Sequence, residues 1–350
     1  MIDRFFEENS WDKIKNSDKP VILYGMGNGA DMIIDIFNKY SIRWDDIFAS
    51  DKFVRGHSFH GKKVLKYNEI KEKYDDFIVV MTFALHDDES IEFVRRISSE
   101  HTLLAPTVPV AGDGLFTREF VEENIDKFNK VYELLADEKS RKSFENVVKF
   151  KISGKVDYLF EIYSEDDEIY ENIFKFNENE TILDLGAYDG DTVRKFYEKT
   201  NGKYNKIIAL EPDKKNFLKL EKNTQDIKDI QLVNAGAWNE NTTLYFQKSA
   251  GRQSKVTENS TQTVEARTVD SFEKNFSFIK MDIEGSEKNA LIGAEKTIRS
   301  LHPKLYICAY HRNEDLFELP LLIKSFDKSY RFYFRQHKYI PAWESNFYII

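Results

Sequence analysis

Polar side chains follow two apolar segments in the second half of this sequence, and their types suit a transfer reaction at a hydroxyl group. Lys280, Asp282 and Glu284 lie toward the end of FIKMDIEGSE, and His311 follows the apolar residues of LYICAYHR. Because an imidazole titrates near neutral pH, His311 could act as the general base that removes the proton of an alcohol, or it could hydrogen-bond a substrate. These four residues are the candidates for catalysis.

The carboxylates of this group have two further interpretations. Asp282 and Glu284 could share a Mg²⁺ or Mn²⁺ ion with a diol, although two oxygens do not complete the coordination shell of either metal. Local roles are the alternative, since Glu284 or Ser286 could cap the helix that follows, and Asp282 could orient Lys280 or His311.

A second candidate site is the segment TILDLGAYDGDT, residues 181–192, which is followed by IIALEPD. The pattern predicts a buried parallel strand and then a tight turn at Gly186 and Gly190, where the backbone can approach a ligand. Glu211 lies 25 residues after Gly186 (211 − 186), at the end of the next strand, where a carboxylate can accept hydrogen bonds from both hydroxyls of a ribose. The segment therefore predicts a nucleoside site that comprises Asp184, Gly186, Ala187, Tyr188, Gly190, Asp191, Thr192, Glu211, Asn234, Ala235 and Asp282.

The acidic residues of this turn indicate which nucleoside it suits. Asp189 and Asp191 would place negative charge where the pyrophosphate of a dinucleotide would have to bind. S-adenosylmethionine instead has a sulfonium cation that tolerates carboxylates, and Asp184 could meet the cationic amino end of its tail. The turn therefore favours S-adenosylmethionine, with methyl transfer to an oxygen held in line with the sulfonium. Asp191 or Thr192 is expected to cap the helix that follows. The alternative is that GAYDG is only a tight turn from strand to helix.

The elements that must position these residues alternate between strands and helices. Apolar segments predict strands at residues 182, 207, 230, 278 and 305, with helices beginning near residues 192, 214, 286 and 314. The aromatic segments YRFYFRQ and NFYII predict a final hairpin with an antiparallel strand at the sheet edge. We therefore expect an α/β, doubly wound sheet with the strand order 3-2-1-4-5-7-6 of class I methyltransferases. Strand ends meet at one edge of such a sheet, where the loop 250–256 could also line the cofactor or the acceptor.

The first part of the chain contains a similar pattern. In KPVILYGMGNGADMIID, Gly25, Gly27 and Ala30 fit G-x-G-x-x-A, and Asp51 ends the next strand 26 residues after Gly25 (51 − 25). With further apolar segments beginning at residues 77 and 102, this predicts a Rossmann-like domain over residues 1–112. The domain could dock a nucleotide-linked acceptor, with Gly25, Gly27 and Asp51 at the mouth of the site, or it could be purely structural.

Between the two glycine patterns the apolar residues have helical spacing. Residues 113–176 therefore predict a helical connector, and residues 177–350 a methyltransferase domain. The later part of the connector, residues 157–176, could fold over the ligand, or it could pack the two domains together. A chain of 350 residues is long enough for two domains.

Four segments together resemble the FkbM family of S-adenosylmethionine-dependent methyltransferases. These segments are ILDLGAYDGDT, ALEPD, FIKMDIEGSE and AYHRNEDLFELP, similar to the family pattern in type and order over about residues 155–350. Members with this tail and an added amino-terminal domain look like enzymes of polysaccharide gene clusters. The resemblance implies O-methylation of a sugar hydroxyl in bacterial surface polysaccharide biosynthesis (capsule, lipopolysaccharide or O-antigen), with a carbohydrate or nucleotide-linked sugar as acceptor.

Composition excludes several other classes of protein. The formal charge is −9 and no block of Lys or Arg offsets it, which disfavours nucleic acid as a partner. No stretch approaches the roughly 20 apolar residues of a membrane span, and no signal peptide is evident, so we expect a cytoplasmic protein, with a homo-oligomer as an open possibility. The single cysteine, Cys308, should fill the core. The remaining histidines, His57 and His60 among them, are expected at the surface.

Two other functions stay open at this point. The first domain could belong to an NAD-dependent sugar oxidoreductase or epimerase, although residues 1–112 lack a convincing Tyr-x-x-x-Lys catalytic pair. A noncatalytic sensor of sugar nucleotides that uses both folds for binding is the other. Binding of S-adenosylmethionine or of NAD would separate the first two classes.

Overall fold

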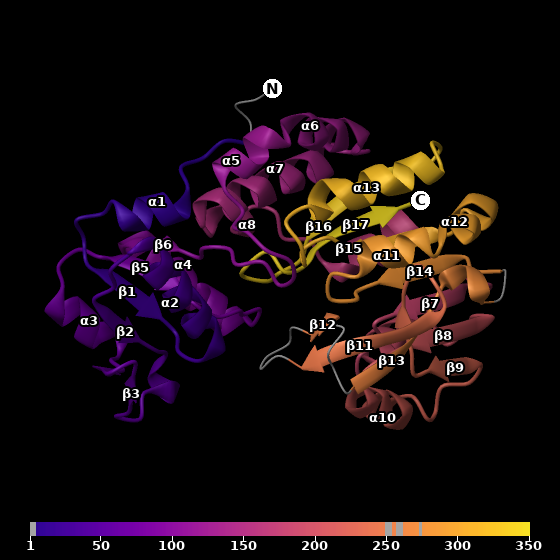
Figure 1. The fold of residues 1–350 in the computed structure, drawn as a ribbon, viewed down its shortest axis with the longest axis horizontal. Helices are drawn as coiled ribbons and strands as arrows, with labels where there is room; N and C mark the ends of the chain where they lie inside the picture. The colour runs from indigo at the N-terminus through magenta and orange to yellow at the C-terminus, as the bar shows by residue number, and fades with distance from the viewer. Residues whose placement is uncertain (1–4, 249–253, 257–261, 273–274) are drawn as a thin grey trace.

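The computed structural model of this chain describes residues 5–248, 254–256, 262–272 and 275–350. Two β-sheets lie side by side, each with helices packed on it, and a group of helices bridges them along one side (Figure 1). The two glycine patterns thus belong to two different sheets.

The amino-terminal sheet is built from the parallel strands β1 (Val21–Tyr24), β2 (Asp46–Phe48), β5 (Ile78–Met81) and β6 (Thr102–Leu104). They lie in the order β2-β1-β5-β6, and every residue of β1 and β5 is buried, as expected of strands covered on both faces. The other elements of this part are α1 (Ser10–Lys15), α2 (Asn28–Tyr40), η2 (Asp51–Phe53), β3 (Ser58–Phe59), β4 (Lys62–Lys63), α3 (Tyr67–Lys73) and α4 (Asp88–Glu100). The predicted alternation of strands and helices is confirmed.

Helices follow, as the spacing of residues 113–176 predicts: α5 (Arg118–Glu123), α6 (Ile125–Leu134), α7 (Glu138–Ser153), α8 (Asp157–Phe160) and the π-helix η3 (Glu168–Phe174). Asp137 caps α7 by accepting a hydrogen bond from the backbone N–H of Ser140, and Gly154 ends this helix in a left-handed conformation. The Oγ of Ser140 accepts a hydrogen bond from the backbone N–H of Phe334, 3.0 Å away, in the carboxy-terminal sheet. Helix α7 is therefore bonded directly to that sheet.

The carboxy-terminal sheet contains, among the described residues, the strands β7 (Thr181–Leu185), β8 (Lys206–Leu210), β9 (Ile230–Val233), β14 (Phe278–Met281), β15 (Lys304–Cys308), β16 (Phe332–Gln336) and β17 (Ser345–Ile349). Their order is β16-β17-β15-β14-β7-β8-β9, and β17 is antiparallel to both of its neighbours. Numbered within the sheet, this order reads 6-7-5-4-1-2-3, which confirms the predicted topology. The helices are α9 (Asp191–Lys199), α10 (Lys214–Asn223), α11 (Glu287–Ile292), α12 (Glu295–Leu301) and α13 (Asp315–Phe326).

A small sheet between β9 and β14 was not expected. It consists of β10 (Gly236–Ala237), β11 (Thr242–Lys248), β12 (Ser254–Val256) and β13 (Gln262–Arg267), and the 3-10 helix η4 (Val269–Ser271) follows it. The loop predicted over residues 250–256 is part of this region: residues 250–253 lie outside the described part of the chain, and the other three form β12. Whether this segment lines a ligand stays a prediction.

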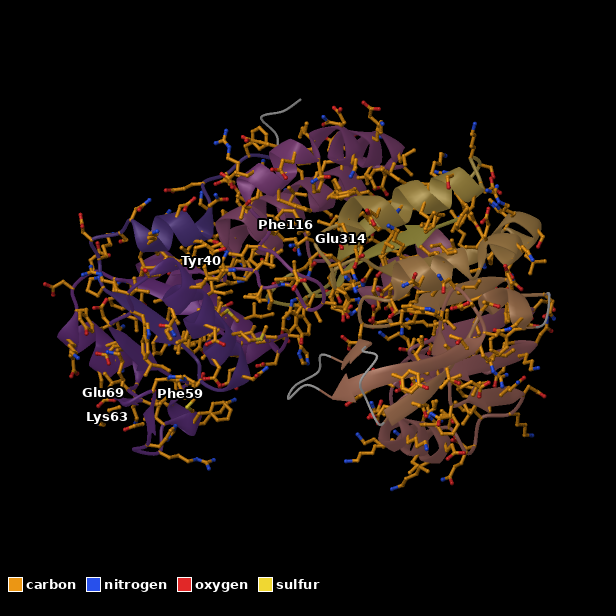
Figure 2. The ribbon with its side chains drawn as sticks, in the orientation of Figure 1. Tyr40, Phe59, Lys63, Glu69, Phe116 and Glu314 are labelled. Atoms are coloured by element: carbon orange, nitrogen blue, oxygen red, sulfur yellow. The ribbon has the colours of Figure 1, made fainter. Side chains whose placement is uncertain are left out.

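One hydrophobic cluster extends from the amino-terminal sheet through the helices to the carboxy-terminal sheet. The ring of Phe128 in α6 lies 5.1 Å from that of Phe317 in α13, and the ring of Phe144 in α7 lies 5.4 Å from that of Phe334 in β16. Phe116, in the middle of the molecule in Figure 2, is buried in the same cluster. Because each buried aromatic side chain contributes about 1.5 to 3 kcal/mol, these helices fasten the two sheets together.

Two predictions from composition can be compared with the structure. Cys308 is buried in β15 with a free thiol, which confirms its role in the core. No helix among the described residues is both long enough and apolar enough to cross a membrane.

Candidate active site

The glycine turn between β7 and α9 is shaped by the strand beside it. Gly186 has a φ of +83°, and a Cβ at this position would lie 1.8 Å from the backbone carbonyl oxygen of Asp282, just beyond β14. Gly190 has a φ of +95°, and its Cβ would lie 3.0 Å from the side chain of Thr224. The glycines were expected to allow the close approach of a ligand. In the structure, the atoms that approach them closely belong to the protein itself.

The start of α9 also differs from the prediction. Gly190 occupies the N-cap position and makes no side-chain hydrogen bond, so the predicted cap by Asp191 or Thr192 is wrong. Asp191 is the first helical residue, and its Oδ1 accepts a hydrogen bond from the backbone N–H of Thr192, 2.7 Å away. Its carboxylate lies near the positive end of the helix dipole and therefore still stabilises α9.

Glu211 is held at the end of β8 by backbone groups on two sides. Its Oε2 accepts a hydrogen bond from the N–H of Tyr188 at 2.9 Å, and its Oε1 accepts one from the N–H of Asp213 at 2.8 Å. The side chain is only 6% exposed, and burial raises the pKa of Glu211 to about 7. Asn234 also bonds to this segment, because its Nδ2 donates a hydrogen bond to the backbone carbonyl of Glu211. Ala235, the next residue, is buried.

Each oxygen of Glu211 has a lone pair beyond the one that it gives to the backbone, so the carboxylate can still accept hydrogen bonds. Tyr188, whose N–H it binds, has a φ of 48° and a half-exposed side chain at the turn. Glu211 and the glycine turn are therefore joined, as a ribose site at this strand end requires.

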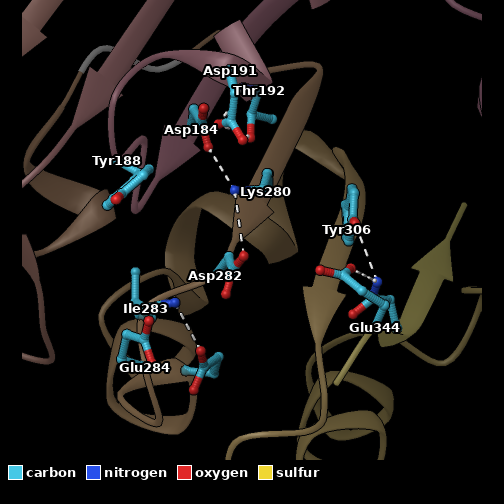
Figure 3. Close-up of polar contacts among 12 residues, drawn as sticks. Asp184, Tyr188, Asp191, Thr192, Lys280, Asp282, Ile283, Glu284, Tyr306 and Glu344 are labelled. Carbon is cyan, nitrogen blue, oxygen red and sulfur yellow. Dashed lines mark hydrogen bonds and ion pairs between the residues drawn. The ribbon is translucent and has the colours of Figure 1, made fainter. Parts of the chain in front are cut away.

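Lys280 lies between two carboxylates beneath the strand ends, as Figure 3 shows. Its Nζ donates to Oδ1 of Asp184 at 3.3 Å, and lies 4.0 Å from Oδ2 of Asp282. Asp184 and Lys280 are neighbours in the registers of β7 and β14, and both are buried. Burial opposes the charge on Lys280, but the two carboxylates outweigh it and raise the pKa of the ammonium. The nearest charged partner of Asp184 is thus a lysine of the protein.

His311 is fully buried among three carboxylates. Its Nδ1 lies 2.9 Å from Oε1 of Glu287, and its Nε2 lies 3.4 Å from Oδ1 of Asp282 and 3.7 Å from Oε2 of Glu284. Burial lowers the pKa of His311, but the charge of Glu287 and then those of Asp282 and Glu284 raise it to about 10. The three carboxylates thus favour a positive charge at the position of the imidazole, and a role of His311 as general base stays a prediction.

The local roles expected of these residues are found only in part. Ser286 occupies the N-cap position of α11 without a side-chain hydrogen bond, and Oε1 of Glu287 accepts from the N–H of Ile283 instead, at 2.9 Å. Asp282 does orient its neighbours, since its Oδ1 also accepts a hydrogen bond from the hydroxyl of Tyr310 at 3.1 Å. Glu284 has a φ of 54° and an exposed carboxylate.

A cleft of about 460 Å³ opens at the carboxyl ends of β7, β14 and β15. Asp191, Thr192, Lys280 and Asp282 line it, so the structure brings the glycine turn and the predicted catalytic strand together. Residues 164–167 and Tyr170 form another wall, which agrees with the expectation that the segment 157–176 lies over the site.

Among the cleft residues that sequence reasoning missed are His337 and Glu344, in the loop between β16 and β17. His337 was expected at the surface, but its Nε2 lies 2.5 Å from the hydroxyl of Tyr348, and burial lowers its pKa. Burial, reinforced by the charge of Asp282, raises the pKa of Glu344 to about 7, and Glu344 accepts a hydrogen bond from Asn346 (Figure 3). A histidine and an acid in HKYIPAWES, between two strands of the same sheet, were the available signal.

The amino-terminal turn does not contribute to this cleft. A Cβ on Gly25 would lie 2.3 Å from the side chain of Phe83, and Asp51 is exposed at the start of η2. The only Tyr-x-x-x-Lys spacing in residues 1–112 is Tyr67 with Lys71, and both side chains bond to Glu100. A ligand at Gly25, Gly27 and Asp51 stays a prediction.

Known proteins resemble the chain in both sequence and fold. Residues 184–341 match the family model of the methyltransferase FkbM domain. The crystal structure of methyltransferase FkbM from Methylobacillus flagellatus KT is 22% identical, with a TM-score of 0.76 over 99% of this chain and 95% of that chain. At this identity the likeness shows the fold alone. No curated protein sequence matches significantly.

Two further solved structures cover only part of the chain. An rRNA methylase from Streptococcus thermophilus is 13% identical over 52% of this chain and 90% of that chain, with a TM-score of 0.35. A precorrin-6y C5,15-methyltransferase from Geobacter metallireducens GS-15 is 9% identical over 54% and 93%, with a TM-score of 0.34. Neither is similar enough to support an argument about this chain. The match of residues 184–341 to the methyltransferase FkbM domain and the sheet order 3-2-1-4-5-7-6 together identify this part of the chain as a methyltransferase domain with a class I methyltransferase fold.

Proposed function

We propose that this protein is an S-adenosylmethionine-dependent O-methyltransferase that acts on a hydroxyl group of a sugar or sugar derivative. The observation that carries the proposal is the position of Glu211, a buried carboxylate at the end of β8 that is fixed to the glycine turn. The family supplies methyl transfer, and the finer assignments rest on the residues of the site.

The proposed cofactor-binding site extends from Glu211 to Lys280, across the ends of β8, β7 and β14. Glu211 would accept hydrogen bonds from the ribose hydroxyls, and Asn234 and Ala235 would border the adenine. One carboxylate oxygen of Asp184, Oδ2, is buried without a hydrogen-bond partner among the described residues, which suits the cationic amino end of the tail. When bound, S-adenosylmethionine supplies an electrophilic methyl group on a sulfonium.

The carboxylates around the cleft favour such a cofactor over a phosphate-bearing one. Six acidic residues line it against three lysines, two of which, Lys195 and Lys280, already pair with Asp166 and Asp184, so an anion would meet net repulsion. A sulfonium and an ammonium would instead be attracted. The charge of the cleft therefore agrees with the choice of S-adenosylmethionine over NAD.

The acceptor hydroxyl must lose a proton during transfer, and His337 is placed to take it. His337 lines the cleft and its pKa is lowered by burial, so its imidazole is neutral at pH 7. Its Nε2 lies within hydrogen-bond distance of the hydroxyl of Tyr348, and its Nδ1 lies 3.5 Å from Oδ1 of Asp166, whose charge would stabilise the imidazolium. We assign the base role proposed for His311 to His337, because His337 lines the cleft whereas His311 lies behind it, enclosed by Glu287, Asp282 and Glu284.

The sugar acceptor and the polysaccharide pathway rest on the family resemblance and on the cleft. Carbohydrate hydroxyls bind to carboxylates, amides and hydroxyls, and Ser164, Glu344 and Tyr306 supply such groups along one wall. A nucleotide-linked sugar could extend toward residues 1–112, because the backbone of Leu85 pairs with Ile340 beside His337. The proposed domain boundaries are 1–112, 113–176 and 177–350.

Calorimetry on the full-length protein tests the cofactor first. We expect binding of S-adenosylmethionine and S-adenosylhomocysteine, and none of NAD. Tight binding of NAD with no response to either sulfur compound would overturn the proposal. A screen of nucleotide sugars and polysaccharide fragments for the gain of one methyl group by mass spectrometry then identifies the acceptor.

A further inference from the structure

His311, Asp282 and Glu287 form a compact group behind the cleft. One potential ligand atom from each residue lies within 4.8 Å of the others. His311 and Glu287 are fully buried, whereas Asp282 is partly exposed and lines the cleft. Two of the three side chains are therefore enclosed in the interior, and the third faces the solvent of the cleft.

Several polar atoms of this group lack the hydrogen bonds that buried atoms usually make. Both ring nitrogens of His311 and Oε2 of Glu287 have no hydrogen-bond partner among the described residues. The approach of Nδ1 to Oε1 of Glu287, at 2.9 Å, is an ion-pair contact that does not have hydrogen-bond geometry. Because leaving a buried donor or acceptor unsatisfied is costly, these atoms point to a ligand between them.

Charge in the surroundings is strongly negative. Electrostatic interactions link five acidic residues to one another or to His311, and Lys280 is shared between two of them, Asp184 and Asp282. The five are Asp184, Asp282, Glu284, Glu287 and Asp315. Asp315 is buried and repelled by the charge of Glu287. A cation at the centre of the group would relieve this repulsion.

We propose that His311, Asp282 and Glu287 bind one divalent cation. Two carboxylates and one imidazole are ligands that suit Mn²⁺ and its transition-metal neighbours better than Mg²⁺, which prefers oxygen alone. Glu284 has an exposed carboxylate 3.7 Å from Nε2 of His311, and it can swing toward the ion as a fourth ligand. The remaining positions face the cleft through Asp282 and would hold water or the hydroxyls of a ligand.

This site deepens the proposed function and rests on it for its role, though not for its existence. A cation beside Asp282 would coordinate an acceptor hydroxyl and favour loss of its proton. The acceptor class that suits such a site is a vicinal diol, whose two oxygens can chelate one ion. The Mg²⁺ or Mn²⁺ expected from Asp282 and Glu284 would thus have its buried ligands in His311 and Glu287.

Metal binding can be measured without cofactor or acceptor. Full-length protein is treated with EDTA, dialysed and titrated with MnCl₂ at pH 7.5 by calorimetry, while electron paramagnetic resonance reports free Mn²⁺. We expect one saturable site per chain. Asp282→Asn and Glu287→Gln should each weaken Mn²⁺ binding by about tenfold or more, whereas Asp226→Asn, which alters an exposed ion pair with Arg194, should not change it.

Circular dichroism of each variant separates loss of the site from loss of the fold. A folded wild-type protein that binds no Mn²⁺, or binds it with the same affinity after both substitutions, would overturn the site and leave a protonated His311 as the only cation of the group. The readout is independent of the proposed function. Methyl transfer in the presence of EDTA would support the proposed methyltransferase function and reject a role for the metal in the reaction. Mn²⁺ binding without methyl transfer to any acceptor would support the metal site and reject the proposed function.

Discussion

In both glycine turns of this chain, a backbone carbonyl from beyond the neighbouring strand occupies the space that a side chain would need. In the amino-terminal turn, a Cβ on Gly29 would lie 2.1 Å from the carbonyl oxygen of Thr82, just beyond β5; in the carboxy-terminal turn, a Cβ on Gly186 would lie 1.8 Å from the carbonyl oxygen of Asp282, just beyond β14. Glycine is needed in both because the neighbouring strand leaves the sheet across the turn. The glycines of both turns therefore specify the packing of a doubly wound sheet, whether or not a ligand binds.

What distinguishes the turns is the chemistry that surrounds them. Glu211 is buried and fixed by two backbone N–H groups, whereas its counterpart Asp51 is exposed on a short 3-10 helix. Beyond β5 the chain places Phe83 against Gly25, whereas beyond β14 it places Asp282 in the lining of a cleft. An acid anchored at the second strand end is a better mark of a nucleoside site than the glycines are.

The largest effect is expected from adding one methyl group to the carboxy-terminal turn. Gly186→Ala would force a Cβ into a backbone carbonyl at a φ of +83°, and the free energy of unfolding should fall by more than about 4 kcal/mol. Gly27→Ala is the matched control, because its φ is +102° but its Cβ would meet nothing within 4 Å; it should cost about 1 to 2 kcal/mol. Urea denaturation measures both. Equal losses would show that backbone strain, and not the strand beside the turn, sets the requirement.

The sheet could be predicted because its signals are local. Runs such as IVVM and IIAL are apolar throughout, and turns with glycine follow two of the strands, so the order of elements was visible in the sequence. The small sheet was missed because β10 is two residues long and pairs with β13, whose partner residues lie 30 positions away (266 − 236). The alternation in TVEAR was its one local sign.

The cleft was predictable only for the residues that follow parallel strands. Asp282 and His311 could be placed near one another, but the contact of His311 with Glu287 depends on how α11 packs. His337 was missed because its loop is held by the backbone pairing of Ile340 with Leu85, more than 250 residues away in sequence (340 − 85 = 255). Such contacts have no signature in a single sequence.

The second prediction tests which histidine serves the reaction. His337→Asn should lower kcat by about 10²- to 10⁴-fold, the usual contribution of a positioned base, and leave the affinity for S-adenosylmethionine unchanged. His60→Asn, which alters an exposed histidine of the amino-terminal part, should retain full turnover. Steady-state kinetics with the identified acceptor measures both variants. Full turnover in His337→Asn would remove this residue from the mechanism.

The third prediction compares the two acids at the strand ends. Glu211→Ala should weaken binding of S-adenosylmethionine by about 1.5 to 3 kcal/mol, because charge-assisted hydrogen bonds to the ribose would be lost. Asp51→Ala, at the equivalent place in the other sheet, should have no effect on this affinity. Calorimetry decides between them, and an unchanged affinity in Glu211→Ala would reject the ribose contact.

The pH dependence of binding should follow from the same carboxyl group. Because burial raises the pKa of Glu211 to about 7, the affinity for S-adenosylmethionine should fall by about tenfold between pH 8 and pH 6, as the carboxylate is protonated. Stability should move the other way: a raised folded pKa contributes stability below the unfolded value of 4.5, and this contribution is lost as pH rises through 7. In Glu211→Gln the dependence of affinity on pH should disappear over this range; if it persists, another group is responsible.

The smallest effect is expected where the two parts of the chain touch beside the cleft. His86 stacks on Tyr339 with ring centroids 5.5 Å apart, next to the pairing of Leu85 with Ile340. His86→Ala should cost about 0.5 to 1.5 kcal/mol of stability through lost stacking. If the amino-terminal part also holds the loop that carries His337, KM for the acceptor should rise severalfold with little change in cofactor affinity. Equal KM values in the wild type and the variant would mean that this contact joins the two sheets without shaping the cleft, and that the amino-terminal turn is structural in its effect on the reaction.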